Sequence, residues 1–192
     1  MIPMGPEPAI AAGARATPRV GAAGMWTFLA TDAMGFGGLF IAYAMLRVRA
    51  DAWPDPRARL PLAPVAAMTF ALLISSLTMT LAARASSGRS RSGWLGATLA
   101  LGTAFLAGAL LEYRHLWTAA VPMRVRGDLF ASTYYLLTGY HALHVLVGLV
   151  CLTAVWLGRA KPKTVEVVAL YWHFVDLAWM PIFTFVYLVP TR

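Results

Sequence analysis

Five long runs of apolar residues, separated by short polar connections, dominate the chain. They are Met25–Leu46, Leu62–Ala83, Trp94–Leu111, Leu129–Leu157 and Val167–Val189. A run of about 20 apolar residues is long enough to cross the ~30 Å hydrocarbon core of a membrane as a helix. None of the runs alternates polar and apolar residues as the strands of a membrane barrel do. The pattern therefore predicts an all-α, polytopic membrane bundle of five transmembrane helices.

The five runs account for about two-thirds of the chain beyond its first 24 residues, and the connections between them are short. We expect residues 1–24, rich in Ala, Gly and Pro, to form a mobile N-terminal tail, and residues 25–190 to form a single five-helix domain. The tail lacks the pattern of a signal peptide, because the apolar run behind it is full length. Pro181 lies inside the last run, where we expect it to bend the helix rather than end it.

Composition supports a membrane protein and narrows its chemistry. Of the 192 residues 59% are hydrophobic and 12% are charged, whereas soluble domains carry roughly 25% charged residues. The net charge is +8, yet all 16 Lys and Arg residues lie in connections and tails. We interpret them as anchors at the lipid headgroups rather than as a nucleic-acid surface. They divide equally between the two sides, so they do not set the orientation. A single cysteine excludes disulfides within this chain and Cys-rich metal sites.

Aromatic and basic residues near the ends of the runs are candidates for contact with lipid. Trp and Tyr rings are amphipathic and collect at the membrane–water interface, and Arg side chains extend to phosphate groups from helix ends. The residues that we assign to lipid or interface contact are Trp26, Trp94, Trp172 and Arg84.

Ionisable side chains inside the runs mark candidate functional positions, because a charge deep in a bilayer costs several kcal/mol unless it is paired or hydrated. Two carboxyls and three histidines lie there: Asp32, Asp176, His141, His144 and His173. His141 and His144 share one face of the fourth helix, and His173 and Asp176 share one face of the fifth. Three interpretations remain open: metal or haem ligation, a proton relay from His to Asp, and hydrogen bonding that joins the last two helices.

Short motifs occur along the chain in a fixed order. They are Trp26–Met34 followed by Gly35-Phe36, Glu112-Tyr113, Ser132–Tyr135 with Thr138–His144, Glu166, and Tyr171–Asp176. Together they resemble subunit III of the haem–copper respiratory oxidases, in its short five-helix bacterial form, from about Met25 to Tyr187. Two departures stand out. Asp32 replaces a Glu of the family, one methylene longer, and Met180-Pro181-Ile182 replaces an unbroken apolar stretch.

The resemblance implies an accessory subunit that is not catalytic and has no redox centre or metal site of its own. It would pack directly on subunit I of the oxidase, with subunit II and small subunits as further partners, and haem and copper would lie in those partners. Phospholipid would bind in a cleft between the first two helices and the other three.

The resemblance also implies roles for the intramembrane residues. Asp32 and Glu112 would support proton uptake, and His141, His144, His173 and Asp176 would form a polar network between helices. The location implied is the bacterial inner membrane, multi-pass, with the N-terminus in the cytoplasm.

Four other assignments compete with this one. Subunit III of a quinol oxidase, or the homologue associated with nitric-oxide reductase, would share the fold and the motifs. A stand-alone haem b membrane cytochrome would use His141, His144 and His173 as ligands. A small transporter would use Asp32 and Asp176 as a proton path.

Overall fold

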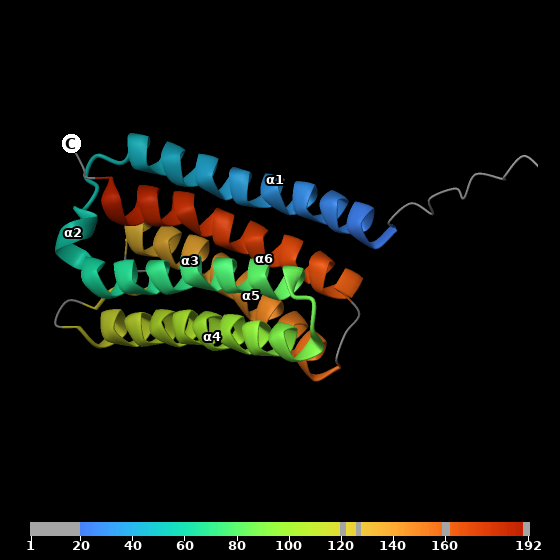
Figure 1. Cartoon of the computed structure of the whole chain (residues 1–192). Coiled ribbons are helices and arrows are strands. Elements are labelled where there is room, and N and C mark those ends of the chain that lie inside the picture. Colours follow the sequence, from blue (N-terminus) through green and yellow to red (C-terminus); the bar gives the residue numbers. More distant parts are fainter. Residues whose placement is uncertain (1–19, 120–121, 126–127, 159–161, 190–192) are drawn as a thin grey trace, which may run out of the picture.

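The protein is a bundle of five long helices with one short helix at its end (Figure 1). The computed structural model describes residues 20–119, 122–125, 128–158 and 162–189. Its elements are α1 (Val20–Arg49), α2 (Pro56–Arg59), α3 (Leu62–Arg84), α4 (Gly88–Thr118), α5 (Leu129–Leu157), α6 (Pro162–Ile182) and the π-helix η1 (Phe183–Leu188). Five of the helices are long and apolar enough to cross a membrane. The predicted all-α class and the five transmembrane helices are confirmed.

Most of the helices extend beyond the apolar runs that predicted them. The longest, α4, has 31 residues, about 46 Å at 1.5 Å per residue, which exceeds the ~30 Å hydrocarbon core and reaches through both headgroup layers. Helix α1 begins at Val20, so residues 20–24 are helical although we expected them in the tail. The expected tail otherwise falls on residues 1–19, which lie outside the described residues.

The order of helices around the bundle differs from their order in the sequence. Helix α1 packs against α5 and α6, while α3 packs against α4 and α6 (Figure 1). The first two spanning helices therefore do not form a unit apart from the other three. The structure therefore contradicts the predicted lipid cleft between the first two spanning helices and the other three, because α1 and α3 are each packed directly against α6.

Trp172 on α6 lies at the centre of the bundle and is fully buried. Its indole Nε1 donates a hydrogen bond to Ser75 Oγ on α3 at 3.0 Å. Its ring lies against two glycines: a Cβ added at Gly102 of α4 would be 2.5 Å from the ring, and one at Gly148 of α5 2.9 Å away. The missing side chains at these glycines let three helices close around one indole. The prediction that Trp172 contacts lipid is wrong, because the ring is enclosed by other helices and a tryptophan suits a glycine-lined core as well as an interface.

The last helix continues through Pro181, as expected, and changes to a π-helix at Phe183. Proline lacks a backbone N–H and its ring crowds the carbonyl four residues earlier, so the turn before Pro181 lacks one helical hydrogen bond. The end of α1 holds η1 in place, because Arg47 donates to the carbonyls of Phe185 at 3.2 Å and Val189 at 3.0 Å. Tyr43 donates to the Phe185 carbonyl as well, at 3.1 Å.

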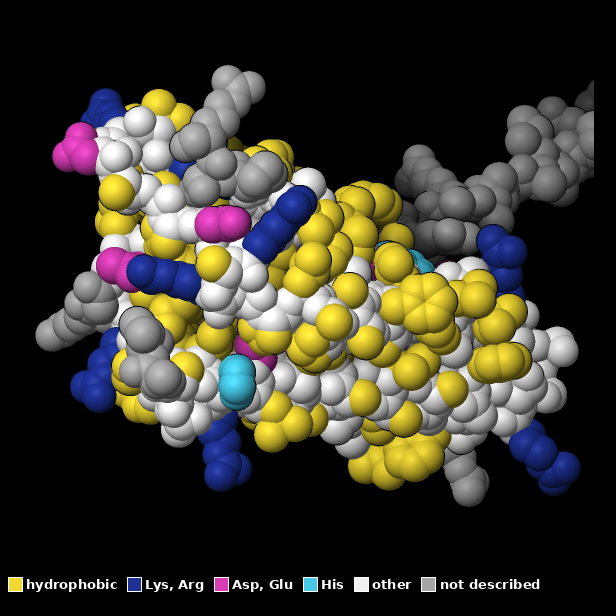
Figure 2. Space-filling view, turned by 90° about the vertical axis from the view of Figure 1, so that its left-hand side faces the viewer, with side chains coloured by type: hydrophobic (Ala, Val, Ile, Leu, Met, Phe, Trp, Pro, Cys, Tyr) yellow, Lys and Arg dark blue, Asp and Glu magenta, His cyan; other side chains and the backbone are white. Residues whose placement is uncertain are grey.

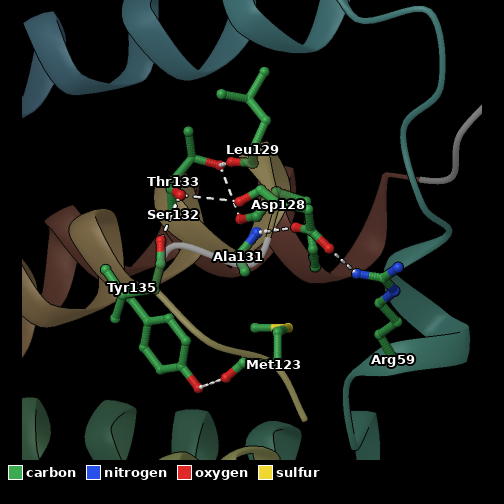
Figure 3. A network of polar contacts seen from close by, with 10 residues as sticks. Arg59, Met123, Asp128, Leu129, Ala131, Ser132, Thr133 and Tyr135 are labelled. Atoms are coloured by element: carbon green, nitrogen blue, oxygen red, sulfur yellow. Dashed lines mark hydrogen bonds and ion pairs between the residues drawn. The ribbon is translucent and has the colours of Figure 1, made fainter. Parts of the chain in front are cut away.

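Charged side chains gather at the end of the bundle that carries α2, with acidic and basic groups side by side (Figure 2). Asp128 caps α5 there by accepting the amide of Ala131 at 2.7 Å, and it forms an ion pair with Arg59 of α2 (Figure 3). Partial burial opposes the ionised form, but the Ala131 amide and the Arg59 guanidinium together hold the pKa of Asp128 below its ordinary value. Its stabilising effect is thus present above about pH 4 and is lost as the pH falls through the lowered pKa.

We expect Gly102→Ala to lower the stability of the bundle by about 1–3 kcal/mol, because the new methyl group would push the enclosed Trp172 ring. The measurement is the thermal unfolding midpoint of the purified protein in detergent. Gly93→Ala is the matched control on the same helix, since nothing lies within 4 Å of a Cβ there. That variant should unfold at the wild-type temperature or slightly above it. Equal midpoints for the two variants would mean that the contact between Gly102 and Trp172 does not hold the helices together.

Candidate functional site

Asp32 on α1 forms a buried polar cluster with α5. Its Oδ1 accepts a hydrogen bond from the Tyr140 hydroxyl at 3.2 Å and lies 3.1 Å from His144 Nε2. The side chains of Asp32 and His144 are only 9% and 12% exposed. Gly35 makes the approach possible, because a Cβ there would be 3.1 Å from the Tyr140 hydroxyl. The Phe36 ring packs edge-on against Tyr140, with centroids 4.8 Å apart, and closes the cluster on the bundle side.

The hydrogen bonds of His144 indicate where protons lie in this cluster. His144 Nδ1 lies 2.7 Å from the Tyr140 carbonyl oxygen, which can only accept, so Nδ1 must carry a proton. One further proton is then needed between His144 Nε2 and Asp32 Oδ1, on the imidazole or on the carboxyl. One proton therefore lies between the imidazole and the carboxyl, and either group can be its donor.

Glu112 on α4 forms a second buried cluster, with two tyrosines. The Tyr187 hydroxyl lies 3.2 Å from Glu112 Oε1 and 3.2 Å from the Tyr134 hydroxyl. Tyr187 belongs to η1, so the π-helix carries this hydroxyl into the bundle. Nearby, the Tyr113 hydroxyl and Thr138 Oγ1 are 2.7 Å apart and join α4 to α5.

The two carboxyl clusters lie in opposite halves of the bundle. Glu112 contacts η1, which packs against Arg47 at the end of α1. Asp32 precedes Arg47 by fifteen residues, about 22 Å along the helix. The resemblance implied support of proton uptake for both Asp32 and Glu112, and the structure places the two carboxyls in separate clusters.

His173 joins α6 to α3 rather than to α5. Its Nδ1 lies 2.6 Å from Ser76 Oγ, and its Nε2 lies 3.4 Å from Thr80 Oγ1. Asp176, one turn further along, is buried, and neither carboxyl oxygen makes a hydrogen bond of ordinary geometry to a described residue. The Ser76 hydroxyl is the polar group beside it, but that hydroxyl is engaged by His173.

His141 is fully buried, and neither ring nitrogen has a hydrogen-bond partner among the described residues. Aromatic rings surround it instead: Phe36 of α1, Phe105 of α4 and Trp179 of α6, with ring centroids 6.4, 5.8 and 4.9 Å away. A charged imidazolium would be costly in such apolar surroundings. His141 is thus a core residue.

The predicted single network of four residues between the last two helices is therefore wrong. His144 pairs with α1, His173 pairs with α3, and His141 and Asp176 make no hydrogen bonds to each other. The sequence did offer one missed signal. Tyr140 precedes His144 by four residues and so shares its face. No sequence signal pointed to Ser76 as the partner of His173.

Three of the four residues assigned to lipid contact lie at the surface. Trp26 is 61% exposed and Trp94 is 38% exposed, and Arg84 is also exposed. An apolar groove of about 430 Å³ beside Trp26, between α1 and α6, includes Leu29, Phe174 and Leu177 in its lining. Across the described ranges, no three His, Cys, Asp or Glu residues gather into a group that could hold a metal ion.

The five spanning helices and their buried polar clusters define a multi-pass membrane protein whose ionisable groups are held between helices. Residues 17–190 match the family model described as cytochrome c oxidase subunit III. The chain therefore belongs to the cytochrome c oxidase subunit III family.

Relatives with two kinds of name are similar to this chain. It is 37% identical to cytochrome c oxidase subunit 3 of Synechocystis, over 86% of this chain and 74% of the relative. It is 33% identical to cytochrome c oxidase subunit 3 of Thermostichus vulcanus, over 86% of each protein. It is also 33% identical to cytochrome bo(3) ubiquinol oxidase subunit 3 of Pseudomonas aeruginosa, over 86% of this chain and 83% of the relative.

The same substitution at the two buried aspartates should have different effects. Asp32→Leu removes the acceptor of Tyr140 and His144, so we expect a loss of about 1–3 kcal/mol in stability. Asp176→Leu removes a carboxyl that makes no ordinary hydrogen bond, so we expect a change within about 1 kcal/mol of wild type. Thermal unfolding in detergent measures both. A larger loss for Asp176→Leu than for Asp32→Leu would contradict the assignment of partners.

Proposed function

We propose that this chain packs on the catalytic subunit I of a respiratory haem–copper oxidase, where it supports proton uptake without taking part in electron transfer. Family membership supports an oxidase complex with other subunits. The Asp32–His144–Tyr140 cluster carries the proposal about protons, because its hydrogen bonds leave one proton to be exchanged between a carboxyl and an imidazole. Haem and copper would belong to the partner subunits, including subunit II.

The location that we propose is the inner membrane of a bacterium, with the N-terminus in the cytoplasm. The basic residues divide equally between the two ends and do not decide the orientation. The orientation that the resemblance implies therefore supports a cytoplasmic N-terminus. Asp32 then lies in the half of the bundle that begins at the cytoplasmic side, from which protons enter an oxidase. Glu112 lies toward the opposite side, so we assign it to the packing of η1 rather than to uptake.

The electron donor has two candidates. The names of the relatives from Synechocystis and Thermostichus favour a cytochrome c oxidase, and that of the relative from Pseudomonas favours a ubiquinol oxidase. We propose the cytochrome c type, with the quinol type as the alternative. The large subunits that copurify decide between them, since a copper-binding subunit that docks cytochrome c belongs to the first type.

We also propose that phospholipid binds this subunit at its surface. Apolar helix faces bordered by exposed tryptophan and arginine side chains support lipid contact. The groove between α1 and α6 is suited to an acyl chain, because leucine and aromatic side chains dominate its lining.

We expect a tagged version of this chain to copurify with a haem-containing large subunit from mild detergent. Without the chain, that complex should still reduce oxygen at first but lose activity during sustained turnover, because proton uptake is less well supported. Oxygen consumption over many turnovers is the measurement. Copurification with a complex that holds no haem–copper subunit would contradict the proposed function.

The isolated polypeptide should show no stoichiometric Soret band and no tightly bound copper or iron. Of the three histidines that a haem cytochrome would use, His173 and His144 are engaged by other helices and His141 is enclosed by aromatic rings. An absorption spectrum and metal analysis of the purified chain test this. A haem b spectrum at one haem per chain would favour the stand-alone cytochrome instead.

A further inference from the structure

A pocket of about 480 Å³ opens at one end of the bundle, between the start of α4 and the end of α5. Its lining includes Arg89, Arg91, Ser92, Leu95, Val155 and Trp156. It is separate from the Asp32 and Glu112 clusters and lies at the end of the bundle where α1 also begins (Figure 1).

The pocket is strongly basic. The segment from Arg84 to Ser92, which connects α3 to α4, contains three arginines and no acidic residue. Within the described part of the chain, Arg89 and Arg91 form no ion pair. One Arg91 nitrogen, Nη2, donates to the Ala85 carbonyl at 2.8 Å, but its Nε is buried without a hydrogen-bond partner. Arg89 is exposed at the pocket and makes no hydrogen bond to a described residue, so an anion there would supply an acceptor that the chain does not.

The tryptophans at and beside the pocket favour a position at the depth of lipid headgroups. The Trp156 indole Nε1 donates to the Ser92 carbonyl at 3.0 Å, which ties the end of α5 to the start of α4. Trp94 and Trp156 are 38% and 39% exposed, as expected of side chains that lie at a membrane–water interface. Leu95 and Val155 are buried and give the pocket an apolar floor, so polar and apolar groups meet within one cavity.

We infer that this pocket binds the phosphate of an anionic phospholipid from the adjacent leaflet, with Arg89 and Arg91 on the phosphate and Leu95 and Val155 against its glycerol and acyl carbons. The first turn of α4 adds to the attraction, because helix N-termini favour anions. This inference deepens the lipid binding proposed above and gives it a specific site. Free phosphate offers the same charge but has no part that would use the apolar floor.

The test uses the assembled oxidase in nanodiscs of phosphatidylcholine with increasing amounts of phosphatidylglycerol. Bound phosphatidylglycerol is counted by native mass spectrometry after release from the nanodisc. The double variant Arg89→Gln, Arg91→Gln should bind phosphatidylglycerol roughly 30-fold more weakly, since each basic side chain near an anionic headgroup contributes about a factor of five. This variant and the control variant described below are first checked for normal assembly with the large subunits.

The matched control is Arg49→Gln, Arg114→Gln, which removes the same charge from two exposed positions at the opposite end of the bundle. It should lose much less phosphatidylglycerol binding than the pocket variant, because neither arginine lines the pocket. Equal loss in both double variants, or no loss in either, would overturn the site. Displacement of phosphatidylglycerol by inorganic phosphate at constant ionic strength would also overturn it, by showing that free phosphate is the ligand. Because the complex is assembled in every arm, failure here leaves the proposed function untouched.

Discussion

The packing of Trp172 between Gly102 and Gly148 is the contact that sets the spacing of the bundle. The indole touches α4 and α5 through the two glycines and donates to Ser75 on α3, so one side chain of α6 joins three other helices. Trp179, two turns further along α6, repeats the arrangement by donating to Thr69 of α3 at 2.9 Å and packing against Phe105 of α4. In a bilayer the helices gain no hydrophobic free energy by associating, because lipid tails are as apolar as their side chains. Close packing and interhelical hydrogen bonds must hold them instead.

Ionisable residues lie in the bundle in two ways, either in hydrogen-bonded clusters between helices or enclosed by aromatic rings. Helix α1 packs against α5 and α6 and carries its carboxyl to Tyr140 and His144. His141 belongs to the same face of α5 as His144 but points into the aromatic layer that Trp179 and Phe105 form. Aromatic rings lie against both histidines, but only His144 also makes hydrogen bonds to described residues. The face of a helix is wide enough to span both.

Much of the fold could be read from the sequence, and the partners of its polar residues mostly could not. The length of the apolar runs fixes the number of spans, because hydrocarbon leaves the backbone no alternative to a helix. Nothing in the runs states which helices are neighbours, so pairing His144 or His141 with His173 and Asp176 assumed that consecutive helices share their polar faces. Helix α6 in fact turns His173 toward α3. Trp172 was misassigned for a different reason, because a tryptophan suits both an interface and a glycine-lined core.

The Asp32 cluster joins α1 to α5 through a carboxyl one methylene shorter than the Glu that the resemblance implies at this position. Losing one methylene shortens the side chain by roughly 1.5 Å, the length of one carbon–carbon bond. Gly35 lies nearly one turn after Asp32, and its missing Cβ lets the Tyr140 hydroxyl come against α1. The phenol and His144 both reach Asp32 Oδ1 at hydrogen-bond distance. The close approach of the two helices at Gly35 thus lets the Asp32 carboxyl meet both partners.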